Sequence, residues 1–144
     1  MALPRRYPAT RYRVDAPPDV TARRERERLS GPAIRAFFAI MGRWDVKDED
    51  ARALLGGLSN GPFYDMKRHA DRVVESDRLV RISYLIGIFK ALNILHGRKL
   101  ADEWMQLPNS NPIFAGETPL AFVMRGGLPA MQIVRRLLDA RRAG

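Results

Sequence analysis

The sequence of 144 residues predicts an all-α protein with six to seven helices. Apolar residues recur at spacings of three and four along several segments, which is the pattern of one helical face. Serine, proline and glycine stand where these segments begin and end, as is typical of helix boundaries. No segment shows the strict apolar–polar alternation of a half-buried strand. An all-helical fold is therefore expected.

Length and composition limit the classes of protein that remain. The apolar content of 46% suits one globular domain or two very small ones. No apolar run reaches the roughly 18 to 20 residues that cross a bilayer, and the first residues lack the apolar stretch of a secretory signal. The absence of cysteine excludes disulfides and thiolate metal ligands. A cytoplasmic protein is expected.

The N-terminal segment differs from the rest of the chain. Residues 1–28 contain eight arginines, four acidic residues and few aliphatic ones, and contribute +4 to the total charge of +9. Such a composition buries too little apolar surface to offset the entropy of ordering. We therefore expect a flexible basic arm over residues 1–28, with or without a binding role.

Four helices are expected between Ser30 and Gly97. The first begins at Ser30 and ends near Gly42, and the two short ones that follow cover residues 46–55 and 59–69. The fourth helix is expected to begin at Ser76, which would cap it. Its apolar residues exceed one narrow stripe, which predicts a central helix packed on two sides.

The C-terminal residues predict shorter helices around a stiff loop. A helix from residue 98 ends at Pro108, Thr118 caps the next one, and Gly126-Gly127 separate it from the last. The loop between them contains Phe114, which we expect to pack inward with Trp104 and Phe122. The polar residues between Pro108 and Pro112 are expected to face outward.

Catalytic chemistry is not indicated. His69 and His96 stand at predicted helix ends without a paired carboxylate or a metal-ligand spacing, and no phosphate-binding glycine motif occurs. Nothing combines a nucleophile with a base. We expect no enzyme, no cofactor and no metal site.

The two short helices around Gly56-Gly57 have the outline of a helix-turn-helix. In that arrangement the second helix enters the major groove of DNA. The candidate DNA-binding residues are Ser59, Asn60, Tyr64, Lys67 and Arg68. An ordinary pair of helices with a solvated polar face is the alternative.

The C-terminal half resembles the toxin-binding domain of the Xre/MbcA/ParS antitoxin family, and ParS in particular. The matching residues are Trp104, Pro108, Asn109, Phe114, Gly116, Thr118, Pro119, Leu120, Gly126, Val134 and Leu137. The preceding residues are similar to the Xre-like helical domain of those antitoxins. The resemblance covers roughly residues 32–144 and does not extend to the arm at 1–28. It implies an Xre-like helix-turn-helix domain at 29–97 and a toxin-binding domain at 98–144.

The resemblance also implies a function: a type II antitoxin that occludes the active site of a RES-domain, NAD-using toxin and represses its own operon. The implied partners are that toxin, a second copy within a heterotetramer or larger complex, and operator DNA. The candidate toxin-binding residues are Trp104, Asn109, Ser110, Asn111, Glu117, Arg135, Arg136, Arg141, Arg142 and Gly144. The alternative is a DNA-binding regulator without a toxin, whose C-terminal half only dimerises. The toxin's reaction and target, the operator, the dimer interface and the role of the arm stay open.

Overall fold

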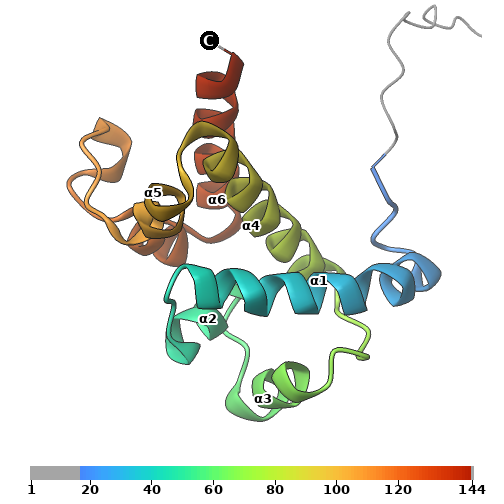
Figure 1. Ribbon diagram of the computed structural model, residues 1–144. Helices are drawn as coiled ribbons and strands as arrows, with labels where there is room; N and C mark the ends of the chain where they lie inside the picture. Colours follow the sequence, from blue (N-terminus) through green and yellow to red (C-terminus); the bar gives the residue numbers. More distant parts are fainter. Residues whose placement is uncertain (1–16, 144) are drawn as a thin grey trace, which may run out of the picture.

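The computed structural model describes residues 17–143. These residues form six α-helices and two 3-10 helices and contain no strand, so the predicted all-α fold is confirmed (Figure 1). The helices are α1 (Arg23–Arg43), α2 (Asp48–Leu54), α3 (Asn60–Arg68), α4 (Ser76–Leu95), α5 (Arg98–Glu103), η1 (Trp104–Gln106), η2 (Pro112–Phe114) and α6 (Pro119–Ala143).

Helix α4 is the centre of the fold. It packs against α6 on one side and against α1 on another, and in Figure 1 it runs beside α6 toward the C-terminus. Its buried residues cover more than one face, as the sequence predicted. They are Leu79, Ile82, Leu85, Gly87, Ile88, Ala91 and Leu92. One apolar core extends from α1 to α6, so the N-terminal and C-terminal halves share it.

Helix α1 begins earlier than the sequence predicted. It starts at Arg23, so the expected start at Ser30 is wrong, and residues 23–28 of the expected flexible arm are helical. Ion pairs one helical turn apart, such as Arg23–Glu27, support this first part. Residues 1–16 of the arm lie outside the described residues.

Ser30 is a buried connector within α1. Ser30 is only 1% exposed. Its hydroxyl donates to the carbonyl of Arg26 and accepts the backbone N–H of Val74 at 2.8 Å. Both polar functions of the hydroxyl are therefore satisfied in the core. Ser30 ties the segment before α4 to α1 instead of capping a helix.

Glycines lie at two breaks between helical segments. After α2, Gly56 and Gly57 have φ values of +90° and +84°, which suit residues without a side chain. Gly127 (φ +64°, ψ −147°) breaks α6 into two helical segments, residues 119–126 and 128–143. Both breaks were predicted at these glycines. Thr118 caps the first segment through its hydroxyl, which accepts the N–H of Ala121 at 3.1 Å.

Candidate functional site

The loop of residues 107–118 is held by its own polar side chains. The Asn109 side-chain oxygen accepts the backbone N–H of Asn111 at 2.9 Å, and the Asn111 side-chain oxygen accepts that of Ile113 at 3.1 Å. The N–H of Asn109 donates to the carbonyl of Glu117 at 3.4 Å and joins the two ends of the loop. These bonds and the prolines give a preformed loop. Asn109 and Asn111 are thus only partly exposed, whereas Ser110 faces outward as expected.

A cluster of three aromatic rings anchors the loop on the body of the protein. Phe114 is fully buried, with its ring edge-on to Trp104 at 6.0 Å and to Phe122 at 5.2 Å between centroids. The prediction that Phe114 packs inward with these two partners is confirmed. Trp104, a candidate contact residue, is 6% exposed and lies in this cluster. Its position suits support of the loop.

Two apolar side chains project from the loop surface. Leu107 is 41% exposed and Ile113 is 40% exposed, although each stands beside a buried aromatic cluster. Sequence reasoning did not include either residue among the candidates. The available signal was their position next to Pro108 and Pro112, where stiff backbone would present an apolar side chain to a partner.

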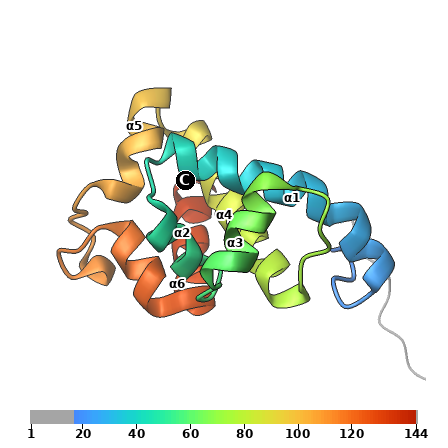
Figure 2. The same cartoon turned by 90° about the horizontal axis from the view of Figure 1, so that it is seen from below.

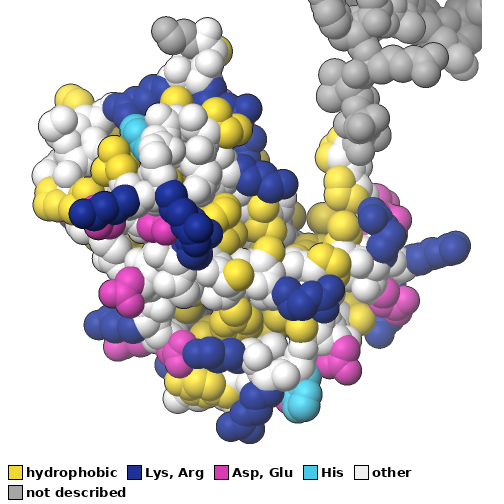
Figure 3. Space-filling model, in the orientation of Figure 1, with side chains coloured by type: hydrophobic (Ala, Val, Ile, Leu, Met, Phe, Trp, Pro, Cys, Tyr) yellow, Lys and Arg dark blue, Asp and Glu magenta, His cyan; other side chains and the backbone are white. Residues whose placement is uncertain are grey.

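The candidate arginines of α6 are placed differently from one another. Arg135 pairs with Asp139 at 2.9 Å and lies over Gly87 of α4. Arg136 and Arg141 are exposed, and among residues 17–143 no acidic group lies within ion-pairing distance of either. Arg142 lies 3.7 Å from Asp139. Lys and Arg side chains gather around this end of the molecule in Figure 3.

The two remaining toxin-binding candidates are Glu117 and Gly144. Glu117, at the end of the loop, forms an ion pair with Arg125 of α6. Gly144 lies outside the described residues. The structure therefore brings the loop and the first turn of α6 together, and the terminal arginines lie at the far end of α6 (Figure 1).

The candidate DNA-binding residues lie on α3 and just before it, below α1 and beside α2 (Figure 2). Ser59, Asn60 and Arg68 are exposed. The Tyr64 hydroxyl donates to Asp48 at 3.0 Å, and the Lys67 ammonium donates to the same carboxylate at 2.9 Å. Two of the five candidates are thus engaged by the first residue of α2.

The carboxylate of Asp48 has an altered acidity. The hydrogen bond from Lys67, followed by that from Tyr64, holds the pKa of Asp48 below its ordinary value. Both donors favour the charged form, and they outweigh the opposing effect of burial. Asp48 therefore remains ionised and keeps its two partners in place at neutral pH.

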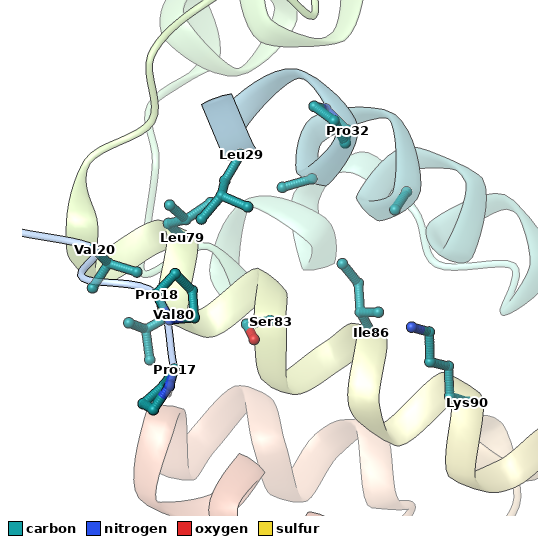
Figure 4. A pocket seen from close by; sticks show the side chains of 12 residues that line it. Pro17, Pro18, Val20, Leu29, Pro32, Leu79, Val80, Ser83, Ile86 and Lys90 are labelled. Atoms are coloured by element: carbon teal, nitrogen blue, oxygen red, sulfur yellow. The ribbon is translucent and has the colours of Figure 1, made fainter. Parts of the chain in front are cut away.

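A hollow of about 650 Å³ lies between α1 and α4 (Figure 4). Its lining is mostly apolar, with Val80, Ser83 and Ile86 of α4 in its floor and Leu29 of α1 above them. Among residues 17–143 no group of three acidic or histidine side chains could hold a metal ion. No helix in that range combines the length and the apolar character that crossing a membrane requires.

These features define an all-α protein in which a pair of short helices is joined through a central helix to a stiff loop and a basic terminal helix. Residues 91–144 match the model of the antitoxin Xre/MbcA/ParS C-terminal toxin-binding domain. A curated relative is the uncharacterized protein y4oB of Sinorhizobium fredii, 34% identical over 112 residues, which cover 77% of this chain and 84% of the relative. No solved structure matches significantly.

The chain belongs to the Xre/MbcA/ParS antitoxin family. Membership supports an antitoxin role, a toxin protein as the partner and a regulatory rather than enzymatic activity. The matched residues begin in the last part of α4 and include α5, the loop and α6.

Proposed function

We propose that the chain is the antitoxin of a type II module and that it neutralises a RES-domain toxin that uses NAD. The loop of residues 107–118 and the end of α6 cover the toxin's active-site cleft. One observation carries this proposal: a preformed loop with an exposed Ile113 lies in the same half as arginines that lack acidic partners among the described residues.

The chemistry of the two surfaces is complementary. A cleft that processes NAD accommodates a pyrophosphate and carries acids near the ribose, and a guanidinium binds such carboxylates in a fixed geometry. Arg136, Arg141 and Arg142 supply guanidinium groups, and Ile113 supplies an apolar anchor. The prolines and asparagine bonds of the loop lower the ordering cost of binding.

The assembly follows from the same proposal. The antitoxin acts as a homodimer within a heterotetrameric or larger complex, and it needs no cofactor because it blocks a cleft instead of catalysing a reaction. The inhibited reaction is either NAD degradation or transfer of ADP-ribose.

Co-expression with the product of the neighbouring gene, which this proposal expects to be a RES-domain toxin, tests the proposal. The double variant Arg141→Ala/Arg142→Ala is expected to lower toxin affinity by about tenfold or more, because it removes two contact charges. Arg23→Ala/Arg24→Ala is the matched control, since it removes two exposed charges from the start of α1. Equal toxin affinity for both double variants and the parent would rule out a contact between the end of α6 and the toxin.

A second candidate activity is autorepression through operator DNA. The observation in its favour is the pair of short helices joined by Gly56 and Gly57, with Ser59, Asn60 and Arg68 exposed. Affinity for the module's own promoter should then exceed that for random duplex of equal length and fall steeply with salt. Equal affinity for both duplexes at matched salt would remove this candidate and leave the antitoxin role untouched.

A further inference from the structure

Two arginines cross between α4 and α6 in opposite directions. Arg81 of α4 extends to the kink of α6 at Gly127, and Arg135 of α6 extends to α4 at Gly87. Together with Gly56, these residues form what we call the arginine clasp: Arg81, Arg135 and the three glycines that their guanidinium groups contact. The contacts of the clasp join residues that are 25, 46 and 48 positions apart in the chain.

Arg135 occupies the space that a side chain at position 87 would need. A β-carbon on Gly87 would lie 1.7 Å from Nη1 and 2.9 Å from Cζ of Arg135. Gly87 is buried in the middle of α4, and the Arg135 Nε donates to Asp139 at 2.9 Å. Because van der Waals contact requires more than 3 Å, only glycine allows the guanidinium to lie on the α4 backbone here.

Arg81 contacts one glycine from each half of the molecule. Its Nε and Cζ lie 3.2 and 3.3 Å from the position of a β-carbon on Gly56, and its Nη1 lies 3.7 Å from that on Gly127. Both glycines have positive φ. The Arg81 side chain is 19% exposed and its Nε donates to Asp77 at 3.1 Å. One planar group thus packs on the turn after α2 and on the kink of α6.

The segment after the kink needs such contacts. Glycine has the widest choice of backbone angles, so Gly127 alone does not fix the direction of residues 128–143. Met131, Val134 and Leu138 are buried in the core and hold the segment against the body. Apolar contact is non-directional and sets separation better than angle. Each guanidinium is held by a carboxylate of its own helix, Arg81 by Asp77 and Arg135 by Asp139, and packs as a rigid plane on a glycine across the interface.

We propose that Arg81 and Arg135 are positioning residues that fix the angle of residues 128–143 and so present Arg136, Arg141 and Arg142 to the partner. The partner in this statement rests on the proposed function, whereas the angle does not. Arg135 was expected to contact the toxin itself. In this assignment it acts from within the chain.

Spin labels test the angle without a toxin. The chain has no cysteine, so labels attach only where cysteine is introduced. Exposed positions are available on α1 (Gly42→Cys), before the kink (Ala121→Cys) and after it (Ala140→Cys). In Arg81→Met and Arg135→Met, the distance distribution between labels 42 and 140 should broaden or shift, and that between 42 and 121 should not. An unchanged 42–140 distribution in both variants overturns the proposal.

A double variant separates positioning from simple packing. Gly87→Ala alone should displace the Arg135 guanidinium and broaden the 42–140 distribution. Gly87→Ala/Arg135→Ala relieves the clash but lacks the guanidinium, so the distribution should stay broad. A return to the narrow parent distribution would mean that packing alone sets the angle, against the proposal. Circular dichroism of each variant confirms that it is folded before the distances are read.

Toxin affinity completes the experiment. With the RES-domain toxin of the proposed function as probe, Arg81→Met should bind about tenfold more weakly, because the binding surface is no longer preorganised. Arg81→Lys, which keeps the charge and the Asp77 pair, should recover part of that loss. Variants with broadened distances and full affinity would overturn the positioning role. Failure of the parent itself to bind would instead refute the proposed function and leave the distance result standing.

Discussion

The α2–α3 region and the α6 region both contain a helical break at glycine, but they use surface charge in opposite ways. Residues 45–69 hold five acidic and four basic side chains, a net charge of −1, whereas residues 119–144 hold five arginines and one aspartate, a net charge of +4. Lys67 is paired within the first region, and Arg136 has no acidic partner among the described residues of the second.

The difference indicates where the molecule is prepared for an anionic partner. A charge paired within the chain must first break that contact before it binds another group, and this lowers the net gain. Unpaired arginines on a positioned helix carry no such cost. We therefore expect the α6 region to be the better binding surface for an anionic partner, whereas Lys67 and Asp48 pair with each other within the α2–α3 region.

The largest expected effect separates support from contact within the loop. Phe114→Ala should lower the free energy of unfolding by about 3 to 5 kcal/mol, because it removes a fully buried ring from the aromatic cluster. Ile113→Ala, on a side chain that is 40% exposed, should change it by about 0.5 kcal/mol or less. Urea unfolding of both variants measures the difference.

Ile113→Ala should affect toxin affinity much more than it affects stability. Ile113→Ala is expected to weaken binding about tenfold although its stability is nearly that of the parent. Parent-like affinity for Ile113→Ala would mean that the loop only joins two helices, and the comparison between the regions would then depend on the arginines alone.

Local patterns predicted most of the elements. Neighbouring residues in the sequence predicted five features: the glycine breaks at 56–57 and 126–127, the Thr118 cap, the packing of α4 on two sides and the inward position of Phe114. Each depends on backbone preference or on helical periodicity, which a short window of sequence contains.

The remaining features depend on contacts between distant residues. The start of α1 was misplaced because Ser30 reads locally as a cap, whereas its partner Val74 is 44 positions away. The place of Arg135 over Gly87 could not be predicted for the same reason. Asn109 and Asn111 are less exposed than expected because their side chains bond to the backbone of the loop.

A smaller effect is expected from the turn that joins α2 and α3. Gly57→Ala should destabilise the protein by about 1 to 2 kcal/mol, since its φ of +84° disfavours any residue with a β-carbon. Gly61→Ala lies within α3, where no atom lies within 4 Å of the new methyl group, and should stabilise by up to about 1 kcal/mol. Thermal unfolding should move in opposite directions for the two variants. Shifts of the same sign would show that the turn is not a fixed structural unit.

The smallest expected effect concerns Asp48, which pairs with Lys67 within the α2–α3 region. Its lowered pKa means that it contributes stability above its ordinary value of 3.8, and that this contribution is lost as the pH falls below 3.8 through the lowered value. Asp48→Asn should therefore be slightly less stable than the parent at about pH 6, and the difference should vanish under strongly acidic conditions.

The same variant tests whether these contacts oppose DNA binding. Asp48→Asn frees Tyr64 and Lys67 and removes one negative charge, so affinity for duplex DNA should rise a few-fold, with a salt dependence steeper by about one unit for one new phosphate contact. Glu75→Gln is the control, because it also removes one negative charge from an ion-paired acid, here the partner of Arg78, outside α2 and α3. An equal gain for both variants would reflect net charge alone. A gain confined to Asp48→Asn would show that α3 has a DNA-binding face whose Tyr64 and Lys67 are engaged by Asp48 of α2. Both regions could then bind an anionic partner, and only the α2–α3 region would first have to break an internal contact.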